Sequence, residues 1–80
     1  MYDPAKFRVG STVRIADKAT LEEFVRTWRY HHKLTADQLP HAGRVVRVKW
    51  SGMYHGGDMM YDLEGVPGVW HERLLSAVNG

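Results

Sequence analysis

The stretch of sequence that decides the fold runs from residue 54 to residue 75 and reads YHGGDMMYDLEGVPGVWHERLL. Glycine-rich turns at 56–57 and 65–68 divide it into short segments, because glycine takes positive φ without steric cost. Residues 59–64 alternate between apolar and polar positions, which predicts a half-buried strand. Residues 69–71 predict a further strand directly after the second turn. The stretch is therefore typical of a small, turn-rich β protein.

Length and composition limit the rest of the molecule. Eighty residues allow one domain with a single small core. The absence of cysteine removes disulfides and thiolate chemistry, which favours a cytoplasmic setting. No run of apolar residues is long enough to span a membrane, so no membrane association is expected. Eleven Lys and Arg against nine Asp and Glu give a formal charge of +2, which is nearly balanced.

Before this stretch, the chain predicts two more strands. Residues 12–15 alternate and contain β-branched side chains, which places Val13 and Ile15 inward. A lead-in segment precedes them, and Phe7 and Val9 are its expected anchors in the core. After Gly43 a longer strand follows, and its inward face is expected to carry three large side chains: Val46, Val48 and Trp50.

A helical segment separates these two strands. Apolar residues recur at helical spacing over residues 21–30, namely Leu21, Phe24, Val25 and Trp28. Thr20 and Glu23 form a capping-box pattern at its start, and Thr35 with Gln38 repeats that pattern before Pro40. A helix over residues 21–30 and a single helical turn near residues 36–39 are predicted. The helix is expected to cover one end of the β structure, or otherwise to form a partner contact.

Residues 72–75 predict one helical turn, and residues 76–78 predict a fifth strand that closes the sheet. Short strands, glycine turns and a final helical turn before the last strand are the order of an SH3-like barrel. The fold class is therefore mainly β with one inserted helix: a five-stranded SH3-like barrel over residues 1–80, with a helical insertion at about 20–40.

Three segments carry a resemblance to a known family: FRVGSTVRIA at 7–16, GRVVRV at 43–48, and MMYDLEGVPGVWHERLL at 59–75. The chain resembles the barrel domain of the nitrile hydratase β subunit and the small proteins related to it, including the ending Trp70, Glu72 and Leu75. The resemblance implies an SH3-like barrel. In that family the metal is held by the α subunit, so it also implies an accessory or stand-alone module.

The chain departs from the family where the family contacts its metal centre. The nitrile hydratase barrel carries a Gly-His-Thr-Arg segment after its first strand, whereas this chain has residues 27–32, TWRYHH. No active-site residue is carried over from the family, and neither a catalytic residue nor a cofactor is predicted. Fold alone does not give a function.

The candidate contact surface consists of polar and aromatic residues that barrel packing does not obviously require. The leading hypothesis is a non-enzymatic interaction module or accessory subunit that binds a protein partner, or a second copy of itself. The six residues expected to bind this partner are Tyr54, His55, Asp58, Trp70, His71 and Glu72.

Two alternatives from other classes stay open. Imidazole and carboxylate groups around His55 and His71 predict a small enzyme or a metal-binding protein if a site forms at an oligomer interface. The histidine spacing matches no metal motif, so no metal ligand is assigned. A set of aromatic and basic residues predicts a surface that stacks bases and holds phosphates: Tyr54, Tyr61, Trp50 and Trp70 with Arg44, Arg47, Lys49 and Arg73. The near-balanced charge makes nucleic acid the less favoured partner.

Overall fold

The structure of the protein is a computed structural model, and it describes residues 5–29, 33–53 and 59–78. It is mainly β, with one α-helix between the first two strands. The elements in chain order are β1 (Thr12–Ile15), α1 (Lys18–Thr27), the 3-10 helix η1 (Leu39–His41), β2 (Val45–Met53), β3 (Met59–Leu63), β4 (Trp70–His71), the 3-10 helix η2 (Glu72–Leu74) and β5 (Leu75–Ala77).

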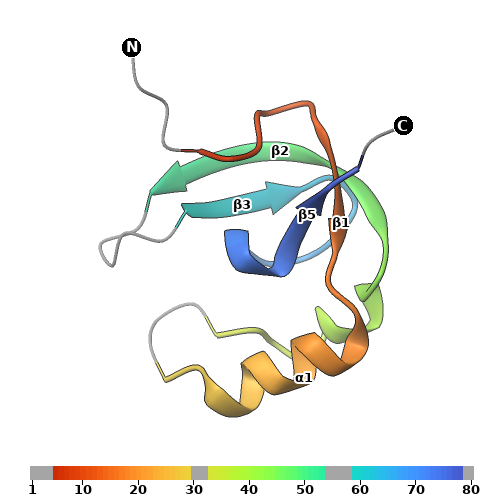
Figure 1. Cartoon of the computed structure of the whole chain (residues 1–80), viewed down its shortest axis with the longest axis vertical. Coiled ribbons are helices and arrows are strands. Elements are labelled where there is room, and N and C mark those ends of the chain that lie inside the picture. The colour runs from red at the N-terminus through yellow and green to blue at the C-terminus, as the bar shows by residue number, and fades with distance from the viewer. Residues whose placement is uncertain (1–4, 30–32, 54–58, 79–80) are drawn as a thin grey trace.

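All five strands belong to one antiparallel sheet with the order β4-β3-β2-β1-β5. Strand β2 is the longest and lies at the centre, curving over the molecule in Figure 1. Its first half pairs with β1 and its second half pairs with β3. The two edge strands, β4 and β5, are consecutive in the chain and are joined by η2 alone. Among the described strands, β4 and β5 do not pair with each other, so the sheet is not closed.

A β-bulge at Lys49 sets which side chains of β2 face inward. Val48 pairs with Leu63, but the next pair is Trp50 with Asp62, so Lys49 has no partner of its own. Such an extra residue reverses the alternation of side chains along the strand. The prediction that Trp50 points into the core is therefore wrong: Val46 and Val48 are buried, whereas Trp50 is 50% exposed.

Helix α1 begins three residues earlier than predicted and ends at Thr27 instead of Tyr30. Asp17, not Thr20, is the N-cap, and its Oδ1 accepts a hydrogen bond from the backbone N–H of Thr20 at 2.8 Å. Hydrogen bonds from the Thr20 side chain and backbone lower the pKa of Asp17, since they stabilise the carboxylate. An aspartate at this position satisfies the free amides of the first turn as well as threonine does.

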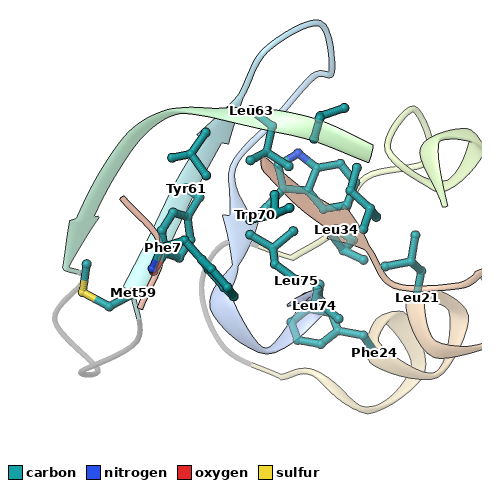
Figure 2. Packing of buried hydrophobic residues seen from close by; sticks show 14 residues of the cluster. Phe7, Leu21, Phe24, Leu34, Met59, Tyr61, Leu63, Trp70, Leu74 and Leu75 are labelled. Carbon is teal, nitrogen blue, oxygen red and sulfur yellow. The ribbon is translucent and has the colours of Figure 1, made fainter. Parts of the chain in front are cut away.

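The core lies between the sheet and α1. Leu21 and Phe24 from the helix are buried against it, while Val25 is exposed. In Figure 2 Phe24 lies beside Leu74, and Leu21 lies on the same side of the cluster as Leu34. The predicted packing of the helix against the β structure is confirmed for Leu21 and Phe24. Phe7, Val13 and Ile15 belong to the core, as predicted, and so do Tyr61, Leu63 and Leu75.

One smaller prediction is wrong. Val9 is exposed, because residues 8–11 form a turn in which Ser11 N–H donates to Arg8 O. Met60 alternates with the inward Tyr61 on β3, yet it is only 3% exposed. Its partner on β2 is Gly52, and the indole of Trp50 lies over that glycine. The Trp50 ring therefore covers this part of the outer face.

Gln38 is a buried polar residue that joins two distant segments. Its Oε1 accepts from Thr35 N–H at 2.8 Å, as the predicted capping pattern requires, and its Nε2 donates to Val69 O at 3.1 Å. The helical turn itself lies later than predicted, at η1, which contains Pro40 instead of ending before it. Because the amide bonds both segments, Gln38 fixes the insertion to the turn that precedes β4.

Candidate functional site

The six residues predicted to bind a partner do not form one exposed surface among the described residues. Tyr54, His55 and Asp58 lie outside the described ranges. Trp70 and His71 are buried, with 0% and 2% exposure, and Glu72 is half-buried. Trp70 and His71 were expected at the surface, and their burial shows that this expectation is wrong.

Trp70 is buried because β4 pairs it with Tyr61, which faces the core. Its indole N–H donates to Pro67 O at 3.1 Å, so the polar atom of the ring is satisfied inside the chain. In Figure 2 the ring lies among the core side chains, beside Leu63. Trp70 therefore stabilises the fold and offers no surface to a partner in this conformation.

His71 is part of an aromatic group between α1 and β4. Its ring lies 4.9 Å from the ring of Phe24 and 4.6 Å from that of Trp28, and those two rings stack at 4.8 Å. The guanidinium of Arg73 lies over Trp28 at 4.8 Å, in cation–π geometry. Trp28, which was predicted on the helical face, thus packs on β4 from just beyond the end of α1.

Glu72 belongs to a hydrogen-bond network that holds the N-terminal segment on the sheet. Its Oε2 accepts from Tyr61 Oη at 2.5 Å and from Lys6 N–H at 3.0 Å. Tyr61 Oη also accepts from Phe7 N–H at 3.3 Å. Burial, and then the hydrogen bond to Glu72, raise the pKa of Tyr61 to about 12. These hydrogen bonds give Glu72 a role in the fold that requires no binding partner.

Replacing Tyr61 with phenylalanine tests this network. The variant keeps the ring in the core but leaves Phe7 N–H and the Glu72 carboxylate without the hydroxyl. We expect it to lower the free energy of unfolding by about 1–3 kcal/mol near neutral pH, as measured by urea denaturation. A variant as stable as the wild type would show that the hydroxyl adds nothing to folding.

The same pair of proteins tests the raised pKa of Tyr61. The folded state holds the phenolic proton up to a pKa of about 12, whereas an unperturbed tyrosine has a pKa of 10.0, so the unfolded state loses this proton first as the pH rises. The stability that Tyr61 contributes is complete below pH 10 and falls between pH 10 and about 12. The difference between wild type and Tyr61→Phe should therefore shrink over that interval; a constant difference would contradict the shift.

The largest exposed aromatic side chain of the described residues is Trp50, on the outer face of β2. A Cβ built on Gly52 would lie 2.2 Å from Cη2 and 2.5 Å from Cζ2 of this indole. The six-membered ring therefore rests directly on the glycine backbone, and only glycine leaves room for it. One side of the ring is supported by the strand, while half of the residue's surface faces solvent.

Basic residues share this outer face. Thr12 pairs with Arg47 and Arg14 pairs with Val45, so both arginines point away from the inward Val13 and Val46. Both arginines are exposed, and so is Lys49 in the bulge. Arg47 Nε donates to Gly10 O at 3.4 Å. Arg14 of β1 and the three β2 residues Arg47, Lys49 and Trp50 are together called the β2 outer surface, after the strand that supplies most of them.

Sequence reasoning included Trp50, Arg47 and Lys49 in the nucleic-acid alternative, but strand alternation placed Trp50 in the core, so the leading contact surface was predicted elsewhere. One signal could have shown that Trp50 lies outside the core. A glycine inside a strand pattern indicates a bulge or a close approach of another group, and Gly52 follows Trp50 by two residues. Here the approaching group is the Trp50 indole itself.

The described residues contain no group of three or more His, Asp and Glu side chains that could hold a metal ion. His41 accepts a hydrogen bond at Nδ1 from Arg44 Nη1 at 2.8 Å, and His71 lies in the aromatic group described above. The remaining histidines, His31, His32 and His55, fall outside the described ranges. Within those ranges, no helix has the length and apolar character that crossing a bilayer requires.

No protein-family model, curated protein sequence or solved structure matches this chain.

Proposed function

We propose that this protein is a small, non-enzymatic binding module built on an SH3-like five-stranded barrel. The strand order β4-β3-β2-β1-β5, and the 3-10 turn η2 between the last two strands, support the barrel assignment. The resemblance to the nitrile hydratase β-subunit barrel supports the same class, since in that family the barrel accompanies a metal-bearing partner. The contact surface of the module is the β2 outer surface, in place of the surface around Trp70 and His71.

A single observation carries this proposal: Trp50 is half exposed, although a domain of this size usually places its large aromatic side chains in the core. Tryptophan is enriched where binding energy concentrates, because a rigid ring buries much area at little entropic cost. Resting on Gly52, the Trp50 ring is already held in one place before a partner arrives. A preorganised side chain loses less entropy on binding than a mobile one.

Partner capture with a Trp50→Ala variant tests the proposed surface. The protein is immobilised and its co-purifying macromolecules, both protein and nucleic acid, are recovered from a cell lysate. We expect species bound by the wild type to be lost from Trp50→Ala. Val25→Ala is the matched control, since Val25 is 44% exposed on the far element α1 and its truncation should leave capture unchanged. Equal capture by all three proteins would remove Trp50 from the contact surface.

A further inference from the structure

The nearly neutral formal charge of the chain conceals an uneven distribution of charge. Helix α1 carries both signs of charge: Asp17 caps it and Glu22 and Glu23 lie in its middle, together with the basic residues Lys18 and Arg26. The β2 outer surface instead carries three cations: Arg47 and Lys49 are within three residues of Trp50 on β2, and Arg14 lies on β1 opposite Val45. Arg8 adds a fourth exposed cation in the turn at residues 8–11, where the backbone of Gly10 and Ser11 bonds to Val48. The gathering of basic residues on one face, which net charge alone does not reveal, is the electrostatic feature of a polyanion-binding surface.

Two carboxylates interrupt this face on the neighbouring strand. Asp62 lies opposite Trp50, and Glu64 donates its backbone N–H to Arg47 O. Within the described ranges, no ion pair joins either carboxylate to Arg14, Arg47 or Lys49. The three cations are therefore available to an anionic ligand, and the two carboxylates weaken the attraction without cancelling it.

The spacing of the surface suits an extended ligand. Arg47 and Trp50 are three residues apart along the strand, which corresponds to roughly 10 Å at about 3.3 Å per residue. A ligand that runs along β2 therefore meets Arg47 first, then Lys49 in the bulge, and then the ring of Trp50. Single-stranded nucleic acid supplies both complements, because each nucleotide has a base that stacks and a phosphate that pairs with Lys or Arg. An acidic peptide would satisfy the cations but has no regular planar group for the ring.

We infer that the β2 outer surface binds single-stranded nucleic acid, with a base stacked on Trp50 and phosphates held by Arg14, Arg47 and Lys49. This inference rests on the proposed function and names the partner class for the same surface. It needs no sequence specificity, since every base has a face that can stack. Duplex ends and unpaired loops would be bound where a base is free to leave its neighbours.

Fluorescence anisotropy of a labelled oligo(dT) strand tests the inference. We expect binding that weakens by roughly twentyfold between about 50 and about 200 mM salt, the dependence for three phosphate contacts on a single strand. Trp50→Ala should weaken binding by about tenfold, and Trp50→Phe by less, because phenylalanine keeps a face for stacking. The corresponding duplex should bind more weakly and with little dependence on Trp50.

Variants that each remove one exposed charge test the electrostatic part of the inference without changing the core. Arg47→Gln and Lys49→Gln should each weaken binding and flatten its salt dependence, whereas Arg26→Gln, an exposed cation on α1, should change neither. Asp62→Asn should tighten binding by about twofold, since it removes a negative charge beside Trp50. A variant that gains affinity cannot have lost its fold, so this result separates a ligand contact from a structural effect.

Three outcomes would overturn the inference: no binding of oligo(dT) at low salt, equal binding by wild type and Trp50→Ala, or equally tight binding of poly-glutamate with the same dependence on Trp50. The last outcome would assign the surface to an acidic protein partner. If oligo(dT) fails but partner capture still depends on Trp50, the nucleic-acid inference falls and the proposed function stands. If neither depends on Trp50, both fall.

Discussion

Replacing Trp70 with alanine should remove about 3–5 kcal/mol of folding free energy. The side chain is fully buried at the centre of the core, and truncation of such a residue leaves a cavity that the neighbours fill only in part. A domain of eighty residues has a total stability of roughly 4–12 kcal/mol. We therefore expect Trp70→Ala to be partly or wholly unfolded at room temperature, as measured by circular dichroism and urea denaturation.

Trp50→Ala is the matched control for this prediction. The same change of residue type on the outer face of β2 should cost about 1 kcal/mol or less, because half of the side chain already faces solvent. If Trp70→Ala is too unstable to measure, Trp70→Phe keeps most of the volume and allows a comparison with Trp50→Phe. Equal costs at the two positions would contradict the placement of one tryptophan in the core and the other on the surface.

Gly68→Ala should lower stability by about 2–4 kcal/mol, the second largest effect that we expect. Gly68 has a φ of 79°, where an L side chain is strained by roughly 1–2 kcal/mol. Its Cβ would also lie 2.5 Å from Gln38 Nε2 and 2.7 Å from Cδ. The amide of Gln38 would have to move, and its bonds to Thr35 and Val69 would weaken, at about 1 kcal/mol for each bond.

Two further variants separate the strain from the clash. Gly65 has a φ of 78° in the same turn, but its Cβ would meet nothing within 4 Å, so Gly65→Ala should show the strain alone. The excess cost of Gly68→Ala over Gly65→Ala should disappear in a Gln38→Ala background, because neighbouring residues give non-additive effects. Additive costs in denaturant unfolding would show that Gln38 and Gly68 act independently.

Trp50 shows where prediction of the candidate site from sequence reaches its limit. Strict alternation through residues 45–50 predicts Trp50 inward, and the pairing of β1 with β2 follows that alternation. The bulge at Lys49 depends on how β2 passes from one partner strand to the next, which is a tertiary property. One inserted residue then exchanges the two faces of the strand. The strands themselves were predictable, but the exposed side chain was not.

Gln38 and His71 show a second limit of prediction from sequence, which is that contacts between distant segments are not visible in it. The pattern from Thr35 to Gln38 predicted the local half of the Gln38 contacts, whereas the bond to Val69 joins residues that are far apart in sequence. The burial of His71 likewise depends on α1 placing Phe24 and bringing Trp28 over β4. Polar residues near a glycine turn look available in sequence, and only the packing of the inserted helix shows which are covered.

Acrylamide quenching of tryptophan fluorescence, with and without oligo(dT), tests most directly that Trp50 is the exposed contact residue. In the free protein we predict that the most quenchable emission disappears in Trp50→Phe and persists in Trp70→Phe. In the wild type, oligo(dT) should protect that emission from acrylamide. Quenchable emission that survives in Trp50→Phe and disappears in Trp70→Phe, or that a bound strand leaves unprotected, would contradict the account.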